Sequence, residues 1–377
     1  MKSNLLFLVA IVLQFLSFDN PSKTIKPGEI WPDNNGVHIN AHGGGILFHE
    51  GKYYWFGEHK VEGKKGNQAW VGVHCYSSKN LTSWNDEGIA LEVVKNDPKS
   101  EITEGCVIER PKVIYNRKTG KFVMWFHLEL KGQGYNAAKT GVAVSDNITG
   151  SFTFLNAVNP NAGIWPHGYP DKLKNTSFSD TLKGWTDDWK KAVKEGMFVH
   201  RDFEKGQMAR DMALYVDDDG KAYHIHASEE NLTLHISELN EDYTDFTGRY
   251  IRVLPTGHNE APAIFKHNKK YYMITSGCTG WAPNAARLLV SDSVLGNWEY
   301  IENPCIGDNK ETSFHSQGTF ILPVEGKKDA FIFMADRWNP ENAIDGRYIW
   351  LPIKFNASGI PYLEWEKEWD LSFFDKM

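Results

Sequence analysis

The sequence has only four cysteines in 377 residues, at positions 75, 106, 278 and 305. None of them forms a CxxC pair, so the spacing typical of a zinc site is missing and we expect no metal centre. The spacing also does not define a disulfide pairing. Buried, unpaired thiols at Cys75, Cys106, Cys278 and Cys305 are the default expectation.

A cluster of basic residues is also missing. The formal net charge is −7 and residues of both signs are interspersed. This distribution lacks the basic surface on which nucleic-acid binding depends, so we expect no nucleic-acid partner.

Only one long apolar run occurs, from Leu5 to Leu16, and it is too short to span a bilayer. It follows a basic residue, Lys2, and precedes polar residues, which is the pattern of a secretory signal. No cysteine follows closely enough to indicate a lipid anchor. We therefore expect residues 1–20 to be a signal peptide, with export to the periplasm or the exterior and no membrane span.

Aromatic residues are abundant, with 14 Trp, 15 Tyr and 21 Phe. Aromatic side chains favour β-strands, and they also form surfaces on which sugars stack. We expect most of these rings to pack in a core and a minority to contact ligand.

A strand–turn–strand pattern recurs five times along the chain. In each copy a small or polar residue precedes a short apolar strand, and a polar turn then leads into a second strand. The leading residues are His42, Glu109, Asp211, Glu260 and Gln317. Further short strands complete these units, and no long amphipathic helix interrupts a unit. This repetition predicts an all-β fold, a five-bladed β-propeller that forms a single catalytic domain over residues 21–377.

Residues 156–207 break the rhythm between the second and third units, because this segment is too long for an ordinary connection. The stretch 179–194 carries apolar residues at helical spacing, and Ser179 or Asp180 is suited to be its N-cap. We expect a partly helical insertion between blades two and three. It either packs on one blade or forms a wall over the mouth of the axis.

The leading residues are expected to converge, since the first strand of every propeller blade lines the central axis. Acids that converge on an axial pocket suit glycoside hydrolysis, in which one carboxyl protonates the departing oxygen and a second group activates or positions water. The alternative is that these acids are solvated residues of the rim or bind a cation.

Six segments carry a further signal. They are AHGGGILFHEGKYYWFGEHK (41–60), VIERPKVIYN (107–116), KFVMWFH (121–127), ARDMALYVDDDGKAY (209–223), EAPAIFKHNKKYYMITSGCTGWAPN (260–284) and ADRWNPENAIDGRYIWLPI (335–353). Together these segments resemble glycoside hydrolase family 43 and, within it, the exo-β-1,3-galactanase-type subfamily. The resemblance covers nearly the whole chain after the signal. It implies a five-bladed propeller and hydrolysis with inversion by direct attack of water.

The resemblance also implies roles for the leading residues. Glu260 matches the general acid, Asp211 the acid that positions and tunes it, and Glu109 an acid that contacts the substrate. The family usually places an Asp general base at the head of the first blade, where this sequence has His42. In the galactanase-type subfamily the same gap occurs, and a glutamine that matches Gln317 takes the position on the water side.

The sequence leaves two residues as candidates for the group that activates the attacking water. Gln317 either orients the water through its carbonyl, as a glutamine does in GTPases, or relays a proton through an imidic-acid tautomer. Glu109 is the conventional base if it lies across the sugar from Glu260 at the roughly 6.5–9.5 Å expected for inversion.

Other residues are expected to contact the sugar, and a tryptophan among them stacks on the apolar face of a galactose or packs between blades. These candidates are His42, Glu58, His59, Arg110, Thr279, Trp281, Arg337 and Trp338.

The sequence therefore predicts an exported, monomeric, exo-acting enzyme that releases galactose from plant-type β-1,3-galactan or arabinogalactan chains and requires no cofactor. An axial calcium ion occurs in the family, but no ligand spacing in this sequence demonstrates one. Two alternatives stay open. One is another family 43 specificity, α-L-arabinofuranosidase or β-galactofuranosidase. The other is a non-catalytic sugar-binding propeller, suggested by the missing Asp base.

Overall fold

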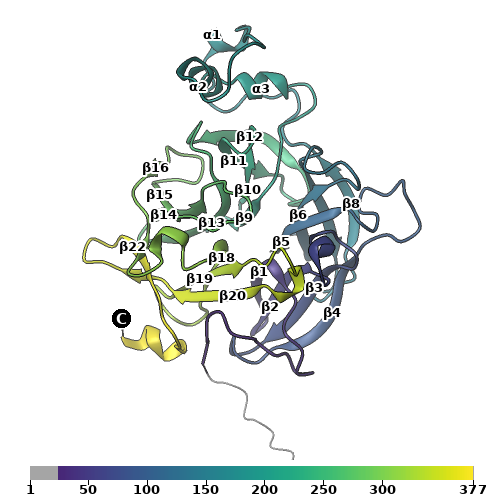
Figure 1. Cartoon of the computed structure of the whole chain (residues 1–377), viewed down its shortest axis with the longest axis vertical. Helices are drawn as coiled ribbons and strands as arrows, with labels where there is room; N and C mark the ends of the chain where they lie inside the picture. Colours follow the sequence, from purple (N-terminus) through teal and green to yellow (C-terminus); the bar gives the residue numbers. More distant parts are fainter. Residues whose placement is uncertain (1–23, 377) are drawn as a thin grey trace, which may run out of the picture.

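The computed structural model describes residues 24–376, which form an all-β propeller with a peripheral helical segment (Figure 1). The predicted signal peptide, residues 1–20, lies outside the described residues. Within residues 24–376 we find no helix that is both long and apolar enough to cross a bilayer.

Four sheets have four antiparallel strands each, joined in chain order. The first contains β1 (His42–His49), β2 (Lys52–His59), β3 (Gly72–Ser78) and β4 (Asn85–Glu92). The second contains β5 (Val107–Asn116), β6 (Lys121–Glu129), β7 (Lys139–Ser145) and β8 (Thr153–Val158). The third contains β9 (Met212–Val216), β10 (Ala222–Ser228), β11 (Thr233–Leu239) and β12 (Phe246–Val253). The fourth contains β13 (Glu260–His267), β14 (Lys270–Ser276), β15 (Arg287–Ser291) and β16 (Glu299–Tyr300).

Two further sheets have three strands each. One contains β18 (Gln317–Pro323), β19 (Phe331–Arg337) and β20 (Arg347–Pro352). The other contains β17 (Cys305–Ile306), β22 (Pro361–Glu364) and β21 (Lys354–Phe355), and its β17–β22 pair is parallel. Short 3₁₀ turns are η1 (Lys64–Asn67), η2 (Lys310–Thr312), η3 (Ala343–Asp345) and η4 (Leu371–Lys376).

The predicted blade count was wrong, because the described residues form six sheets and not five. The strands that follow β20 do not extend its sheet. Instead β21 and β22 form a hairpin, and β22 pairs in parallel with β17, which follows the fourth sheet. The residues from 362 to 374 therefore supply β22 and the turn η4 and do not complete a fifth blade.

The first strands of five sheets contact one another in a closed ring that runs β1, β5, β9, β13, β18 and back to β1. In four of these strands a β-bulge follows the start of the strand. The bulges lie between His42 and Gly45, Glu109 and Lys112, Glu260 and Ala263, and Gly318 and Phe320. Bulges change the direction of side chains next to them, so the leading residues can face the end of the ring while the strands behind them stay packed.

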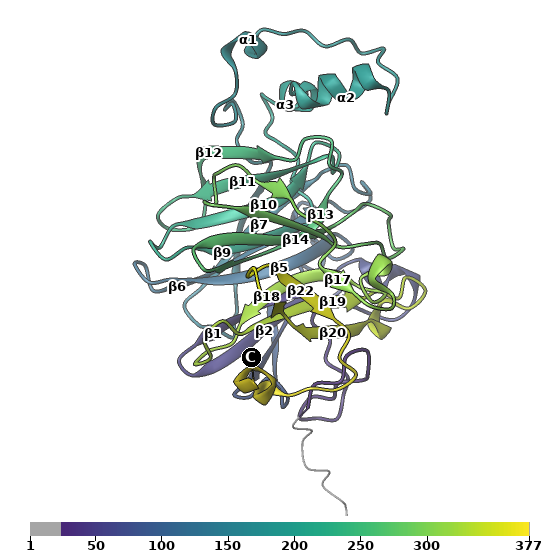
Figure 2. The ribbon, with the colours of Figure 1, turned by 90° about the vertical axis from the view of Figure 1, so that its left-hand side faces the viewer.

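The segment between β8 and β9 carries three short helices, α1 (Asp171–Lys174), α2 (Asp187–Lys194) and α3 (Met197–Arg201). Figures 1 and 2 show them outside the propeller, beyond β12. A helix over residues 179–194 is not formed. The helix begins only at Asp187, with Thr186 as its N-cap, because Trp185 has a left-handed backbone, with φ of 67°. Most of this segment is irregular.

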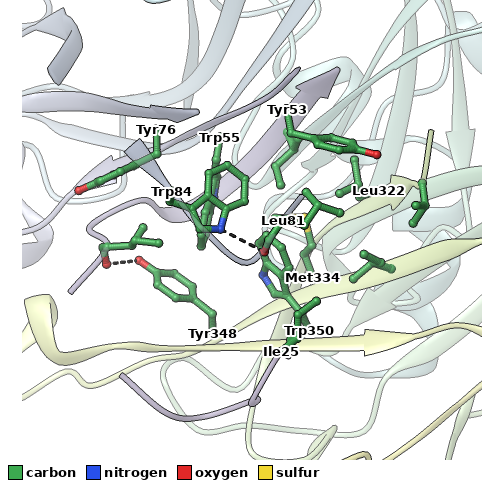
Figure 3. Packing of buried hydrophobic residues seen from close by; sticks show 14 of the residues in the cluster. Ile25, Tyr53, Trp55, Tyr76, Leu81, Trp84, Leu322, Met334, Tyr348 and Trp350 are labelled. Atoms are coloured by element: carbon green, nitrogen blue, oxygen red, sulfur yellow. Dashed lines mark hydrogen bonds between the residues drawn. The ribbon is translucent and has the colours of Figure 1, made fainter. Parts of the chain in front are cut away.

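An aromatic core joins the first sheet to the β18–β20 sheet (Figure 3). Trp55 lies 4.9 Å from Trp350 and 4.6 Å from Tyr348 between ring centroids. The two ends of the described chain meet at this core, since Ile25 and Trp369 exchange backbone hydrogen bonds of 2.7 and 3.1 Å. The four cysteines are unpaired, and Cys278 alone among them is partly exposed.

Candidate active site

A cavity of about 250 Å³ lies at the end of the strand ring. Its volume is below the roughly 300–1,000 Å³ of pockets that hold drug-sized ligands, so it suits one sugar unit better than several. Eight of the predicted site residues line it. They are Glu58, Glu109, Arg110, Asp211, Glu260, Trp281, Gln317 and Trp338.

Glu260 is the first residue of β13, and its side chain is partly buried. Its carboxylate oxygens accept hydrogen bonds of 3.2 Å from Asn231 Nδ2 and 3.2 Å from Gln317 Nε2. Burial and the negative charge of Asp211 raise the pKa of Glu260 to about 7, against the opposing effect of Arg110. A carboxyl with this pKa keeps a proton near neutral pH and can donate it.

Asp211 precedes β9 and links two strands of the ring. Its Oδ2 accepts hydrogen bonds from Arg110 Nη2 at 2.9 Å and from the backbone N–H of Ala261 at 3.1 Å. The second bond fixes the backbone directly after Glu260. Asp211 therefore both positions the strand that carries Glu260 and supplies the charge that raises its pKa.

Glu109, on β5, lies in the opposite electrostatic environment. Its Oε2 accepts a hydrogen bond from His127 Nδ1 at 2.9 Å, and its Oε1 accepts from Tyr135 OH at 2.6 Å and Asn67 Nδ2 at 2.9 Å. Burial acts to raise the pKa of Glu109, but the hydrogen bond and charge of His127 outweigh it and hold this pKa well below its usual range. Glu109 is therefore ionised in the pocket.

His127 is positively charged because it lies between two carboxylates. Its ring nitrogens bond Glu109 and Glu129, each at 2.9 Å. Burial acts to lower the pKa of His127, but these two carboxylates raise it to about 9. Glu129 is fully buried and also accepts the backbone N–H groups of Ala137 and Ala138.

Gln317, at the head of β18, forms hydrogen bonds with both the oxygen and the nitrogen of its side-chain amide. Its Oε1 accepts hydrogen bonds from Arg110 Nη2 at 2.5 Å and Trp338 Nε1 at 3.0 Å. Its Nε2 donates to Glu260 and to Ser276 Oγ. Since guanidinium and indole groups only donate, these partners define which amide atom is the oxygen. Both lone pairs of that oxygen are engaged.

Glu58 and Arg110 form the floor of the pocket. Glu58 contacts Lys60 and accepts the backbone N–H of Arg110 at 2.9 Å. Burial raises the pKa of Glu58 against the effect of Lys60. Arg110 also donates to the carbonyl oxygen of Gly318 at 2.8 Å and lies 5.3 Å from the ring centroid of Trp338.

Two tryptophans form one wall of the pocket. Trp281 and Trp338 meet edge to face, with ring centroids 6.1 Å apart and planes at 76°. Trp281 is 45% exposed, so an apolar sugar face has access to its ring.

Four predicted residues do not line the cavity. His42 is fully buried with its ring stacked on Tyr348. His59 bonds His74, Thr279 donates to the carbonyl oxygen of Ala282, and Arg337 donates to that of Phe314.

Five lining side chains were not predicted, namely Asn67, His127, Tyr135, Arg210 and Asn231. His127 ends the segment KFVMWFH, where a polar residue that closes an apolar strand was a usable signal. Arg210 directly precedes Asp211 in the segment ARDMALYV, which was also a usable signal. The other three lie outside the strands, and no pattern in the sequence distinguishes them from ordinary loop residues.

The candidate metal ligands in the pocket are already engaged in hydrogen bonds and ion pairs. Glu109, His127 and Asp211 offer ligand atoms within 4.8 Å of one another, but these atoms are already paired with each other or with Arg110. Near β1 the amine of Lys112 donates to the carbonyl oxygens of Gly43 and Arg110. Lys112 and its two acceptors do not fit a cation. The expectation that the enzyme requires no cofactor stays a prediction.

A proton-donating carboxyl, an ionised carboxylate and aromatic walls around a cavity of one sugar unit define a propeller glycoside hydrolase. The comparisons with known proteins agree. Residues 179–361 match the model for the glycosyl hydrolases family 43. No curated protein matches the chain.

Three solved structures illustrate the likeness. A family 43 β-1,3-galactosidase bound to galactodeoxynojirimycin is 53% identical with a TM-score of 0.90, over 92% of this chain and all of that one. An exo-β-1,3-galactanase from Phanerochaete chrysosporium with galactose is 30% identical with a TM-score of 0.73, over 92% of this chain and 68% of that one. An exo-β-1,3-galactanase from Clostridium thermocellum is 34% identical with a TM-score of 0.75, over 92% and 66%. The chain belongs to glycoside hydrolase family 43.

Proposed function

We propose that this chain is an exo-acting β-1,3-galactosidase that releases galactose from the ends of β-1,3-galactan or arabinogalactan chains. The observation that carries the proposal is the pair of unlike glutamates in a cavity with room for one sugar. Glu260 keeps a proton near neutral pH, whereas Glu109 is ionised. The relatives named above, described as β-1,3-galactosidases or exo-β-1,3-galactanases, support the choice of sugar and linkage.

In the proposed reaction Glu260 donates its proton to the glycosidic oxygen. The carboxylate that this leaves is stabilised by the N–H donor of Asn231. A sugar that lies between Glu260 and Gln317 breaks the direct hydrogen bond between them. Water attacks the opposite face of the sugar and the configuration inverts; the proton that the water loses passes to solvent, from which Glu260 is reprotonated.

Neither residue that could serve the attacking water is a strong base in this geometry. Glu109 accepts three hydrogen bonds, and its lowered pKa makes it a poor proton acceptor. We assign the positioning of water to Gln317 and the binding of sugar hydroxyls to Glu109. Arg110 and Trp338 already occupy the oxygen of Gln317, so water binding there requires one of these bonds to open.

The decisive experiment measures sugar release from β-1,3-galactan and from aryl arabinofuranosides. We expect galactose from the galactan, no release by Glu260→Gln, and a loss on the order of 100-fold in Gln317→Ala. NMR of the first anomer formed tests inversion. Glu92→Gln, an exposed glutamate on β4, is the matched control and should keep full activity.

Other outcomes separate the alternatives. Arabinose release in place of galactose would overturn the substrate and leave Glu260 as the acid. A Glu109→Gln variant that loses more activity than Gln317→Ala would move the water-side role to Glu109. Export to the periplasm or the exterior is part of the same proposal and rests on the pattern of residues 1–20; retention of the expressed full-length chain in the cytoplasm would count against it.

A further inference from the structure

An exposed tryptophan stands on the segment between β8 and β9. Trp185 is 54% exposed. Its ring lies 5.3 Å from that of Trp189 and 5.2 Å from that of His258, between centroids. The reaction described above does not use this ring, which forms an exposed aromatic group together with Trp189 and His258.

The local backbone holds the ring in this position. Trp185 has a φ of 67°, a left-handed conformation that is rare and strained for a bulky residue. The next residue, Thr186, donates through Oγ1 to the carbonyl oxygen of Lys183 at 2.7 Å and caps α2. The exposure of Trp185 is thus built into a capped turn and does not come from a frayed end.

The segment is also fixed to the loop that forms the pocket. Arg252 on β12 donates to the carbonyl oxygens of Val193 and Lys194, at the end of α2, at 2.6 and 2.8 Å. The same guanidinium bonds Glu229 with two hydrogen bonds, and Glu229 is fully buried. Two residues further along, Asn231 donates to Glu260. Helix α2 is therefore anchored to the stretch of chain that contacts the proposed acid.

Trp185 lies near the start of β13, the strand that Glu260 heads. It contacts His258, whose Cα can be no more than about 7 Å from that of Glu260, since only one residue separates them. Arg287 and the carbonyl oxygen of Leu232 hold the backbone of His258 in place. Because Glu260 faces the departing oxygen in the proposed reaction, this is the side on which the leaving chain emerges.

We propose that Trp185, backed by His258, is a stacking platform for a galactose unit of the leaving chain outside the pocket. The proposal rests on the proposed function, since it needs a substrate longer than the one sugar that the cavity holds. The apolar face of the sugar lies against the indole, and the flat, wide ring tolerates side-chain decoration on the opposite face.

The test compares substrates of increasing length. For Trp185→Ala we expect kcat/KM on longer β-1,3-galacto-oligosaccharides to fall on the order of tenfold, as the loss of one aromatic contact implies. An aryl β-galactoside, whose leaving group is too short to reach the platform, should be cleaved as by the wild type. Trp185→Phe should recover part of the loss.

Two controls make the result specific. Tyr300→Ala on β16 removes a ring of similar exposure, 53%, and should not change the dependence on length. The melting temperature of Trp185→Ala should match that of the wild type. Equal losses on short and long substrates would mean a structural role and overturn the platform.

The remaining outcomes separate this inference from the proposed function. Galactose release by the wild type, with the same length dependence in Trp185→Ala, would overturn the platform alone. A wild-type chain that releases no galactose from any of these substrates would overturn both.

Discussion

Glu260 and Glu109 line the same pocket but differ in their nearest partners. Glu260 accepts hydrogen bonds from neutral donors, two amides and the Cys278 thiol, and Asp211 adds a negative charge beside it. Glu109 is bonded to His127, which two carboxylates keep charged. Two identical side chains thereby take opposite protonation states, which is how enzymes commonly separate acid from anion.

The raised pKa of Glu260 makes a prediction about stability. In the unfolded chain this carboxyl ionises near its usual pKa of about 4.3, but in the folded chain only near pH 7. The stability of the wild type should therefore fall as the pH rises through this interval, because charging the buried group is unfavourable. Glu260→Gln lacks this penalty and should be more stable than the wild type above pH 7, by up to about 4 kcal/mol.

Urea unfolding at pH 4 and pH 8 measures this difference. At pH 4 the variant and the wild type should be closely similar, since Glu260 is largely protonated in both folded and unfolded states. Glu92→Gln should show no such change between the two pH values. A stability gap of the same size at both values would mean that the carboxyl is not held protonated by its surroundings.

Part of the pocket lining could be predicted from the sequence. Glu109, Arg110, Asp211 and Gln317 were predicted at the pocket and line it, because each belongs to a motif at a strand of the ring. Glu58 also lines it as predicted, from the end of β2, where it pairs with the first residue of β1. Asn67, Tyr135 and Asn231 were missed, because their place depends on how separate loops fold over the ring. His42 leads its strand as predicted, but it packs on Tyr348.

The strands of the ring depend on their bulges. Gly43 lies in the bulge of β1 with φ of 61°, and a Cβ there would overlap Glu58 Oε1. Glycine is required at this position for two reasons, the left-handed backbone and the close approach of a pocket carboxylate.

Gly43→Ala and Gly51→Ala separate these two reasons. Gly51 also has a positive φ, 79°, but nothing lies within 4 Å of an added Cβ. Both variants should lose about 1–2 kcal/mol from the backbone strain. Only Gly43→Ala should also lose activity, on the order of 10- to 100-fold, because it displaces Glu58 from Arg110. Melting curves and kcat/KM on β-1,3-galactan measure both effects, and equal activities would argue against the overlap.

The helices show where a prediction from apolar spacing fails. Apolar spacing predicted a helix over residues 179–194, yet the left-handed Trp185 restricts α2 to Asp187–Lys194. The spacing of apolar residues cannot reveal one strained backbone angle, which is set by the contacts of the folded chain.

The whole molecule closes where its two described ends meet. Trp369 is 5% exposed, and its Nε1 donates to the carbonyl oxygen of Trp350 at 2.9 Å. Its backbone also pairs with that of Ile25. This contact joins the first sheet to the last residues of the chain through one aromatic core.

Trp369→Ala should therefore destabilise the entire propeller. We expect a loss of about 3–5 kcal/mol, the usual effect of removing a buried tryptophan. Trp365→Ala is the matched control, since Trp365 is 38% exposed, and should cost about 1 kcal/mol or less. Urea midpoints of the two variants measure the difference. Similar midpoints would show that the closure contributes little to global stability.

The number of sheets was the main error of prediction at this scale. The repeat of strands led by polar residues identified the five strands of the ring, because alternating apolar residues mark each of them. The sixth sheet depends on β17 and β21, strands of two residues each, and on a parallel pairing across more than fifty residues of chain. Strands this short have no periodicity from which a pairing could be predicted.

The bulges at the strand heads have a consequence for how the family can diversify. Each bulge sets the direction of the head residue independently of the alternating apolar residues behind it. The residues that pack the strand and the residue that faces the cavity are therefore at different positions. A substitution at one head changes the chemistry of the cavity and leaves the interdigitating residues of that strand untouched. Gln317, an amide among acids, heads a strand that still pairs with β19 along its length. The residues that line the cavity can thus change while the packing of the strands behind them stays in place.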